Sequence, residues 1–443
     1  MGPAGAAPAE KAVAAVPTDE AVPADESVGR VDRPSDDAPW APLGDTTFRW
    51  FWLASLVSNL GTWVHEVGAG WLMTSLDATP AMVSAVRVAI ATPMMLLAIP
   101  AGALIDRLER KTVLVVTTAM LLVVTITLTA ATFADRITSW GLLAATFAIG
   151  ASMVGHMLAW QATVPGLVPR EQLPRAVALG SVSFNLARAV GPAAGGLLIA
   201  AVGCWAAFGF NAASFAAVAA VLFWWRPTDE PVRPIESFRA TVCVGLRYCF
   251  GRPAIRAVLV HLVAFVAPAS ALWALLPLYV REYLGWNAEG YGVLVAMLGV
   301  GAVTAAVFLH RLHRRLGYDA TVLVTGGLYA ASLGLLSAVV HPAAAVAGAL
   351  VMGAAWMMTL TTLNSVAQLN LPSSIRGRGM SVYYTAMSFS MAAGALVWGW
   401  IAEAITLPPT LGVAAAVMVV GRVGARALRL EAAPPTLAEV TNR

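Results

Sequence analysis

The amino-acid sequence predicts an all-α polytopic membrane protein with roughly twelve transmembrane helices in two pseudo-symmetric six-helix halves. The chain has 443 residues, of which 59% are hydrophobic and 12% are charged, and its mean hydropathy is +0.74. Soluble domains carry about 25% charged residues. Apolar runs of about 20 residues, the length that crosses a bilayer, recur along the chain. A repeat of 203 residues relates its second half to its first.

The apolar runs give the expected helices in order. The first half holds runs at 48–74, 81–105, 112–133, 138–162, 174–201 and 205–225. The second half holds runs at 257–280, 289–309, 319–340, 344–369, 379–402 and 409–428. We therefore expect an N-terminal half at 46–225, a cytoplasmic central loop at 226–256, a C-terminal half at 257–428 and a cytoplasmic C-tail at 429–443.

Residues 1–45 have a different composition. They are rich in Ala and Pro and carry nine acidic residues against three cations, Lys11, Arg30 and Arg33. A segment this polar cannot bury an apolar core, so we expect a disordered acidic cytoplasmic tail. It lacks a basic region followed by an apolar one, which excludes a signal peptide.

The distribution of cations predicts the orientation. Of the 28 Lys and Arg residues, 24 fall on the cytoplasmic side if both termini are cytoplasmic. Arg136 and Arg281 fall outside, and Arg87 and Arg188 lie within spans. Because cytoplasmic loops are enriched in Lys and Arg, this bias predicts a multi-pass membrane protein with both termini in the cytoplasm. Cations confined to loops do not indicate nucleic-acid binding.

The internal repeat extends to particular residues. A shift of 203 lays Arg175 on Arg378, Gly191 on Gly394 and Gly196 on Gly399. Two duplicated halves with a substrate site between them are the arrangement of transporters. The same shift lays Asp106 on Leu309, so the two halves are not equivalent at that loop.

The loop from Gly102 to Lys111 connects the second and third runs. A carboxylate at a helix end among lipid headgroups, such as Asp106, needs a partner, either a cation or a helix N-terminus. The spacing Gly-x-x-x-Asp-Arg-x-x-Arg-Lys resembles the signature loop of the major facilitator superfamily, although Glu109 stands where the usual pattern has Gly. The variant is similar to that of the enterobactin-exporter-like branch, the transmembrane secretion effectors. The resemblance covers about residues 46–402 and implies the major facilitator fold. It implies a gate made of Gly102, Asp106, Arg107, Arg110, Lys111, Arg376 and Arg378.

The fifth run contains small residues at close spacing. Glycines there allow another helix to approach, and a proline favours a kink. Ordinary helix packing explains such residues by itself. Gly-Pro-x-x-Gly-Gly nevertheless resembles the antiporter motif of superfamily exporters, and a preceding Asn-x-x-Arg is typical of the same branch. The antiporter-type motif comprises Asn185, Arg188, Gly191, Pro192, Gly195 and Gly196.

Charged residues within the spans are the candidates for a proton and substrate cavity. Glu66 and Arg87 lie at matching depths in the first two spans, since each residue adds 1.5 Å. They form either a structural ion pair or a proton-binding site, and a tight pair with Arg87 would weaken the second reading. Arg188 lies near the middle of its span, where a cation needs a carboxylate or a polar cavity. The predicted cavity residues are Glu66, Arg87, Arg188, His156, Trp160 and Gln161.

The sequence lacks the motifs of a zinc protease, a metal site and a nucleotide-binding site. His65 and Glu66 begin a zinc-protease pattern, but Ala69 replaces its second histidine, and the cysteines show no metal spacing. No phosphate-binding glycine loop is present. We expect no enzyme, metal or cofactor, and the proton gradient as energy source. The resemblance implies a monomeric, proton-coupled exporter of a siderophore, antibiotic or lipophilic drug. A nutrient importer and a non-transporting sensor or scaffold are the alternatives.

Overall fold

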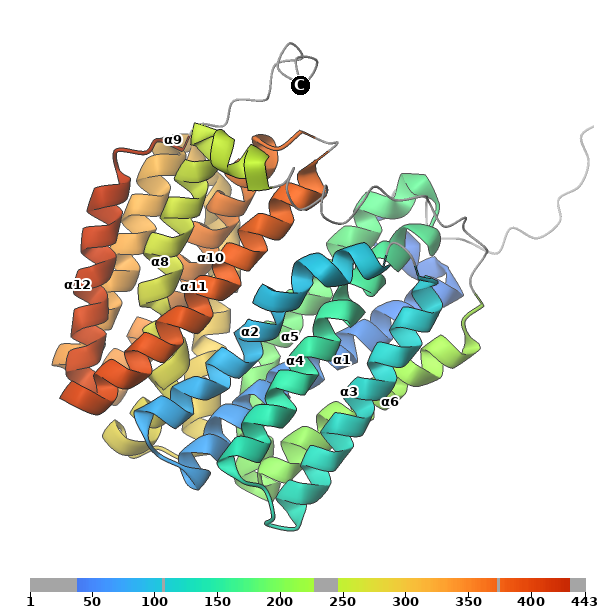
Figure 1. The fold of residues 1–443 in the computed structure, drawn as a ribbon, viewed down its shortest axis with the longest axis horizontal. Helices are drawn as coiled ribbons and strands as arrows, with labels where there is room; N and C mark the ends of the chain where they lie inside the picture. Colours follow the sequence, from blue (N-terminus) through green and yellow to red (C-terminus); the bar gives the residue numbers. More distant parts are fainter. Residues whose placement is uncertain (1–37, 106–107, 227–245, 373–374, 431–443) are drawn as a thin grey trace, which may run out of the picture.

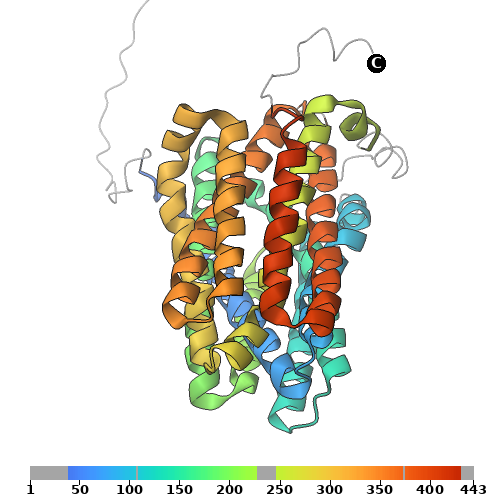
Figure 2. The same cartoon turned by 90° about the vertical axis from the view of Figure 1, so that its left-hand side faces the viewer.

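Two bundles of long helices lie side by side in the computed structural model, which describes residues 38–105, 108–226, 246–372 and 375–430 (Figure 1). Helices α1 to α6 form one bundle and α8 to α12 form the other. No strand occurs in these described ranges. Figure 2 shows the long helices running in roughly one direction, and each hydrogen-bonds its backbone groups within its own segment, as a membrane span requires.

The first bundle contains six long helices. They are α1 (Thr46–Leu76), α2 (Pro80–Ile105), α3 (Arg110–Phe133), α4 (Ser139–Thr163), α5 (Leu173–Val202) and α6 (Cys204–Trp224). Short 3-10 turns, η1 (Ala41–Gly44), η2 (Val164–Gly166) and η3 (Arg170–Gln172), precede α1 and connect α4 to α5. Each helix begins and ends within a few residues of its predicted run.

The second bundle repeats this pattern. It contains α8 (Pro253–Leu278) with the π turn η4 (Tyr279–Tyr283), α9 (Ala288–Ala338), α10 (Pro342–Leu369), α11 (Arg376–Ile405) and α12 (Leu407–Ala425). The 51-residue α9 is two helices joined at Gly317, whose backbone angles are φ 74° and ψ −179°. Only glycine adopts these angles readily, so it separates the two runs predicted at 289–309 and 319–340.

The predicted number of spans is confirmed. Within the described residues, ten helices are long and apolar enough to cross a membrane. That number counts α9 once and omits α1, which is 31 residues long but more polar. With α9 taken as two helices and α1 included, the described parts of the chain hold twelve long helices, six in each bundle.

The bounds of the helices also confirm the internal repeat. A shift of 203 residues converts the bounds of α5, Leu173–Val202, into those of α11, Arg376–Ile405. It also converts the first residues of α4 and α6 into the first residues of α10 and α12. The duplication therefore reaches individual helix ends.

The two bundles share one buried core, and the residues that the first bundle contributes to it lie away from the start of α1. We call the end where α1 begins and α12 ends the terminus end, and the opposite end the far end. The largest buried cluster draws on both bundles and includes Met73, Val86 and Leu272. A second cluster, around Phe51 and Leu114, belongs to the first bundle alone, and a third, around Cys249 and Leu371, to the second. Both single-bundle clusters lie at the terminus end.

Candidate functional site

An ion pair joins α1 to α2 inside the first bundle. Nη1 of Arg87 donates to Oε2 of Glu66 at 3.0 Å, and the two side chains are 15% and 22% exposed. The matching depths of these residues predicted that they would meet, and a pair this close favours the structural reading over the proton-binding one in this state. This partly exposed charged pair lies within two membrane spans, where charges are rare and are usually functional.

Arg87 also contacts the second bundle. Its guanidinium lies 5.5 Å from the ring centroid of Trp273, on α8. Trp273 is buried, and its indole N–H has no hydrogen-bond partner among the described residues. Arg87 is therefore held from both sides, by a carboxylate of its own bundle and by an aromatic face of the other.

Arg188 adds a second cation to the same region. Its guanidinium lies 5.9 Å from the ring centroid of Trp63, on α1, and interacts electrostatically with Glu66. The described residues offer it no hydrogen bond or ion pair. We call Trp63, Glu66, Arg87, Arg188 and Trp273 the inter-half cluster. With one carboxylate and two guanidiniums, it carries a net positive charge when Glu66 is ionised.

The far end is sealed by contacts that the sequence did not predict. Nη1 of Arg281 donates to Oγ1 of Thr74 at 3.0 Å and to Oγ of Ser75 at 2.7 Å, across the two bundles. Tyr291 stacks on Trp71 with a centroid distance of 6.1 Å. The sequence analysis placed Arg281 only outside the membrane, because nothing local in a sequence identifies a partner two hundred residues away.

The glycines of the fifth run hold α5 against two neighbours. A Cβ atom at position 191 would lie 2.6 Å from Cβ of Trp63, so α5 touches α1 at the inter-half cluster. A Cβ atom at position 196 would lie 2.7 Å from the carbonyl oxygen of Ala288 and 2.8 Å from Cα of Gly292, on α9. The motif therefore packs α5 within its own bundle at one position and against the other bundle at the next turn.

The remaining residues of the motif take other positions. Gly195 faces the backbone of Val64 on α1. Pro192 is buried, and α5 continues through it. Asn185 is exposed, and its amide donates to the carbonyl oxygen of Ser181 at 2.8 Å, one turn earlier in the same helix. None of these contacts involves the inter-half cluster.

Three predicted cavity residues lie elsewhere in the first bundle. His156 is buried, with Nδ1 3.3 Å from Oγ1 of Thr118 on α3, and it stacks on Trp160 at 5.7 Å. Trp160 in turn lies 5.0 Å from Phe51. Gln161 is exposed. The structure shows no contact between this group and the inter-half cluster among the residues it describes, because this face of α4 turns toward α3 and the start of α1.

The predicted gate is only partly described. Asp106 and Arg107 lie outside the described residues, as does the side-chain environment of Gly102. Arg110 and Lys111 are the first two residues of α3, and Nζ of Lys111 donates to the carbonyl oxygen of Trp225 at 2.5 Å. Arg376 and Arg378 lie in the first turn of α11. The described ranges contain no group of three His, Cys, Asp or Glu side chains that could hold a metal ion.

Fold and site together define a class of protein: a helical carrier built from two repeated bundles, with charged side chains between them. The chain belongs to the transmembrane secretion effector family of the major facilitator superfamily, whose family model matches residues 37–439. This confirms the family expected from the loop between the second and third spans. It also confirms a transporter rather than an enzyme.

Characterised and uncharacterised relatives agree with this family. The chain is 26% identical to the multidrug efflux pump Tap of Mycolicibacterium fortuitum, over 81% of this chain and 89% of Tap. It is 21% identical to the staphyloferrin A transporter of Staphylococcus aureus, over 66% and 74% of the two chains. The MFS-type transporter YfiS of Bacillus subtilis is 25% identical, over 78% of this chain and 85% of YfiS.

A solved structure shares the fold. A mutant of the nucleoside transporter NupG superposes with a TM-score of 0.69 at 13% identity, covering 86% of this chain and 99% of NupG.

Proposed function

We propose that this protein is a proton-coupled exporter of a small organic molecule that works by alternating access of the two bundles. The observation that carries the proposal is the inter-half cluster: an ion pair and a further cation of the first bundle, with the guanidinium of Arg87 against Trp273 of the second bundle. Charged groups at such a place are where a transporter binds substrate and ions.

Two observations favour export over import. The glycines of the antiporter-type motif make the close approaches between α5 and its neighbours that a moving helix of an exporter needs. Among the relatives, one is a multidrug efflux pump and another a staphyloferrin A transporter. A siderophore, an antibiotic or a lipophilic drug is accordingly the substrate class of this proposal. A nutrient importer of the same fold is the second candidate.

The cation bias supports an orientation for this state. With both termini cytoplasmic in a bacterial inner membrane, the far end faces outward. The contacts between the bundles at the far end and the separate clusters at the terminus end then correspond to a carrier closed to the outside. In this proposal the predicted domains, 46–225 and 257–428, rock about the inter-half cluster in a monomer.

In this proposal Arg87 links proton binding at Glu66 to the movement of the two bundles. In the described state its guanidinium has a carboxylate, Glu66, on one side and the face of Trp273 on the other. Opening the far end separates the bundles, which removes Trp273 from Arg87 and brings outside water to Glu66. A proton that binds Glu66 then releases Arg87 from its ion pair. Glu66 would thus be the proton carrier, and Arg188 the cation offered to the substrate.

The test is substrate accumulation in an efflux-deficient bacterial host that expresses the chain. The panel contains catechol siderophores, macrolides and lipophilic dyes, each with and without a protonophore. We expect lower accumulation of one class, restored by the protonophore. Normal accumulation of the whole panel, with membrane expression verified, would contradict export and favour the importer or the non-transporting sensor.

Substitution at the ion pair separates its two readings. Glu66→Gln should abolish uphill efflux and leave downhill exchange intact, because the neutral amide still fills the site and cannot release a proton. If the pair is only structural, Glu66→Gln with Arg87→Gln should restore both stability and uphill efflux lost in either single variant. Unchanged proton-driven efflux in Glu66→Gln would exclude Glu66 as the proton carrier.

A further inference from the structure

A groove on the outer surface of the first bundle has no part in the proposed transport route. It has a volume of about 960 Å³ and lies at the terminus end, between the first turns of α1, the last turns of α6 and the residues after η2. Trp224 is 80% exposed and Trp50 is 55% exposed on its walls. These rings face the surroundings of the bundle rather than its interior, so the groove opens toward the bilayer.

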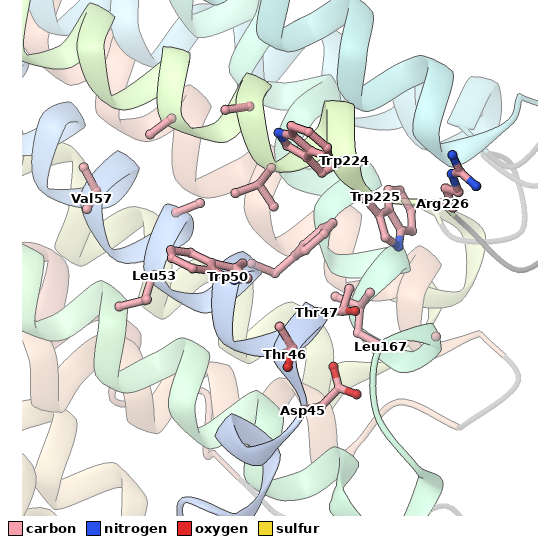
Figure 3. Close-up of a pocket in the computed structure, with 16 residues that line it drawn as sticks. Asp45, Thr46, Thr47, Trp50, Leu53, Val57, Leu167, Trp224, Trp225 and Arg226 are labelled. Atoms are coloured by element: carbon pink, nitrogen blue, oxygen red, sulfur yellow. The ribbon is translucent and has the colours of Figure 1, made fainter.

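The groove changes character along its length. Figure 3 shows Trp50 in the middle, Leu53 and Val57 toward one end, and Asp45, Thr47 and Arg226 toward the other. Leu53 and Val57 follow Trp50 by about one and two helical turns, which places them deeper in the span. The groove therefore has an apolar end in the hydrocarbon region, tryptophan side chains in its middle and polar side chains at its other end, which we call the rim. This order matches that of a phospholipid from acyl chain to headgroup.

The rim offers charges of both signs. Arg226 is exposed, and its guanidinium makes no hydrogen bond or ion pair with any described residue. One oxygen of Asp45 accepts the backbone N–H of Phe48 at 2.9 Å and caps α1, which leaves the second oxygen for another donor. A guanidinium binds a phosphate through paired charged hydrogen bonds. A carboxylate beside an exposed indole face binds an ammonium group.

We propose that this groove binds one phospholipid with a primary-amine headgroup, phosphatidylethanolamine, from the leaflet at the terminus end. Its phosphate lies at Arg226, its ammonium between Asp45 and Trp50, and one acyl chain along Leu53 and Val57. An anionic phosphatidylglycerol would leave the carboxylate of Asp45 without a cation. A phosphatidylcholine headgroup has no N–H to donate to that carboxylate.

The site also adjoins the predicted gate. The carbonyl oxygen of Trp225, which lies in the groove wall, accepts the hydrogen bond from Lys111 at the start of α3. A bound lipid would therefore pack against the end of α6 to which Lys111 attaches.

Native mass spectrometry of the full chain in mild detergent tests the proposal. The protein is titrated with phosphatidylethanolamine, phosphatidylcholine and phosphatidylglycerol of identical acyl chains. We expect one saturable adduct, formed at the lowest concentration with phosphatidylethanolamine. Equal binding of the three lipids, which is the behaviour of unspecific annular lipid, would overturn the proposal, and so would tightest binding of phosphatidylglycerol.

Two substitutions locate the adduct in the groove. Arg226→Gln should weaken it about tenfold, the effect of losing one charge-assisted contact. Asp45→Asn keeps an oxygen to cap α1 and should remove the preference for phosphatidylethanolamine over phosphatidylcholine. Arg136→Gln, at an exposed arginine of the far end, is the matched control and should change nothing. Adducts of Arg226→Gln that equal those of the unsubstituted chain would place the lipid elsewhere and refute the site.

Discussion

Gly196→Ala should weaken the contact that closes the far end. The added Cβ would lie 2.7 Å from the carbonyl oxygen of Ala288 and 2.8 Å from Cα of Gly292. Ordinary contacts between such atoms are about 3.5 Å or longer, so α5 and α9 must separate by roughly 0.8 Å. The obstructing atoms belong to the backbone of the other bundle and cannot rotate away. Overpacking of this kind costs about 1–3 kcal/mol.

This cost applies only while the bundles are packed together at the far end. The population of the closed state should therefore fall about 5- to 150-fold relative to the open state. Spin labels at Ala78→Cys and Glu282→Cys, exposed positions on either side of the far end, report the change. In a variant without the native cysteines, the distance between the two labels, measured by double electron–electron resonance, should lengthen in Gly196→Ala.

The control is Gly180→Ala in the same helix. No atom lies within 4 Å of a Cβ atom at position 180. Both substitutions gain the same helix propensity, about 0.5–1 kcal/mol, so the difference between them isolates the contact with α9. If the distance distribution of Gly196→Ala matches that of Gly180→Ala, the steric argument is refuted.

Three further predictions concern other parts of the chain. Gly317→Ala should lower stability by about 1–3 kcal/mol in thermal unfolding, because alanine is strained at φ 74°, and Gly327→Ala, inside a helix with open space, should not. Burial raises the pKa of Cys249 to about 11. In a variant whose other cysteines are replaced, its reaction with a maleimide near pH 7.5 should therefore be about 100-fold slower than that of a free thiol. The rate should rise about tenfold per pH unit until pH 11, and a rate independent of pH would contradict this. Asp106→Asn should impair transport at normal membrane abundance if Asp106 belongs to the gate, and full activity would exclude that role.

Much of the fold could be predicted from the sequence because bilayer thickness imposes one length on every span. The runs, the repeat and the family all follow from local pattern, and the structure or the family match confirms each. The meeting of Glu66 with Arg87 was also predictable, since counting residues from a short turn gives depth in neighbouring antiparallel helices.

Partners between the bundles were not predictable in the same way. Hydropathy is nearly uniform around a membrane helix, so it does not reveal which face meets which neighbour. His156 and Trp160 illustrate this, because their depth suited a cavity but their face of α4 packs against α3 and α1. Arg281 illustrates the converse, since a residue counted only for topology donates across the bundles to Thr74.

The sequence by itself determined that this protein is a twelve-helix carrier of two duplicated halves, with Glu66, Arg87 and Arg188 among its charged interior residues. Only the tertiary structure decided that Arg87 also rests on Trp273 and that Gly196 touches α9. The physical reason is that length and polarity are properties of each segment alone. A contact between segments depends on rotation about each helix axis and on backbone approach, which the packing of all the helices fixes together.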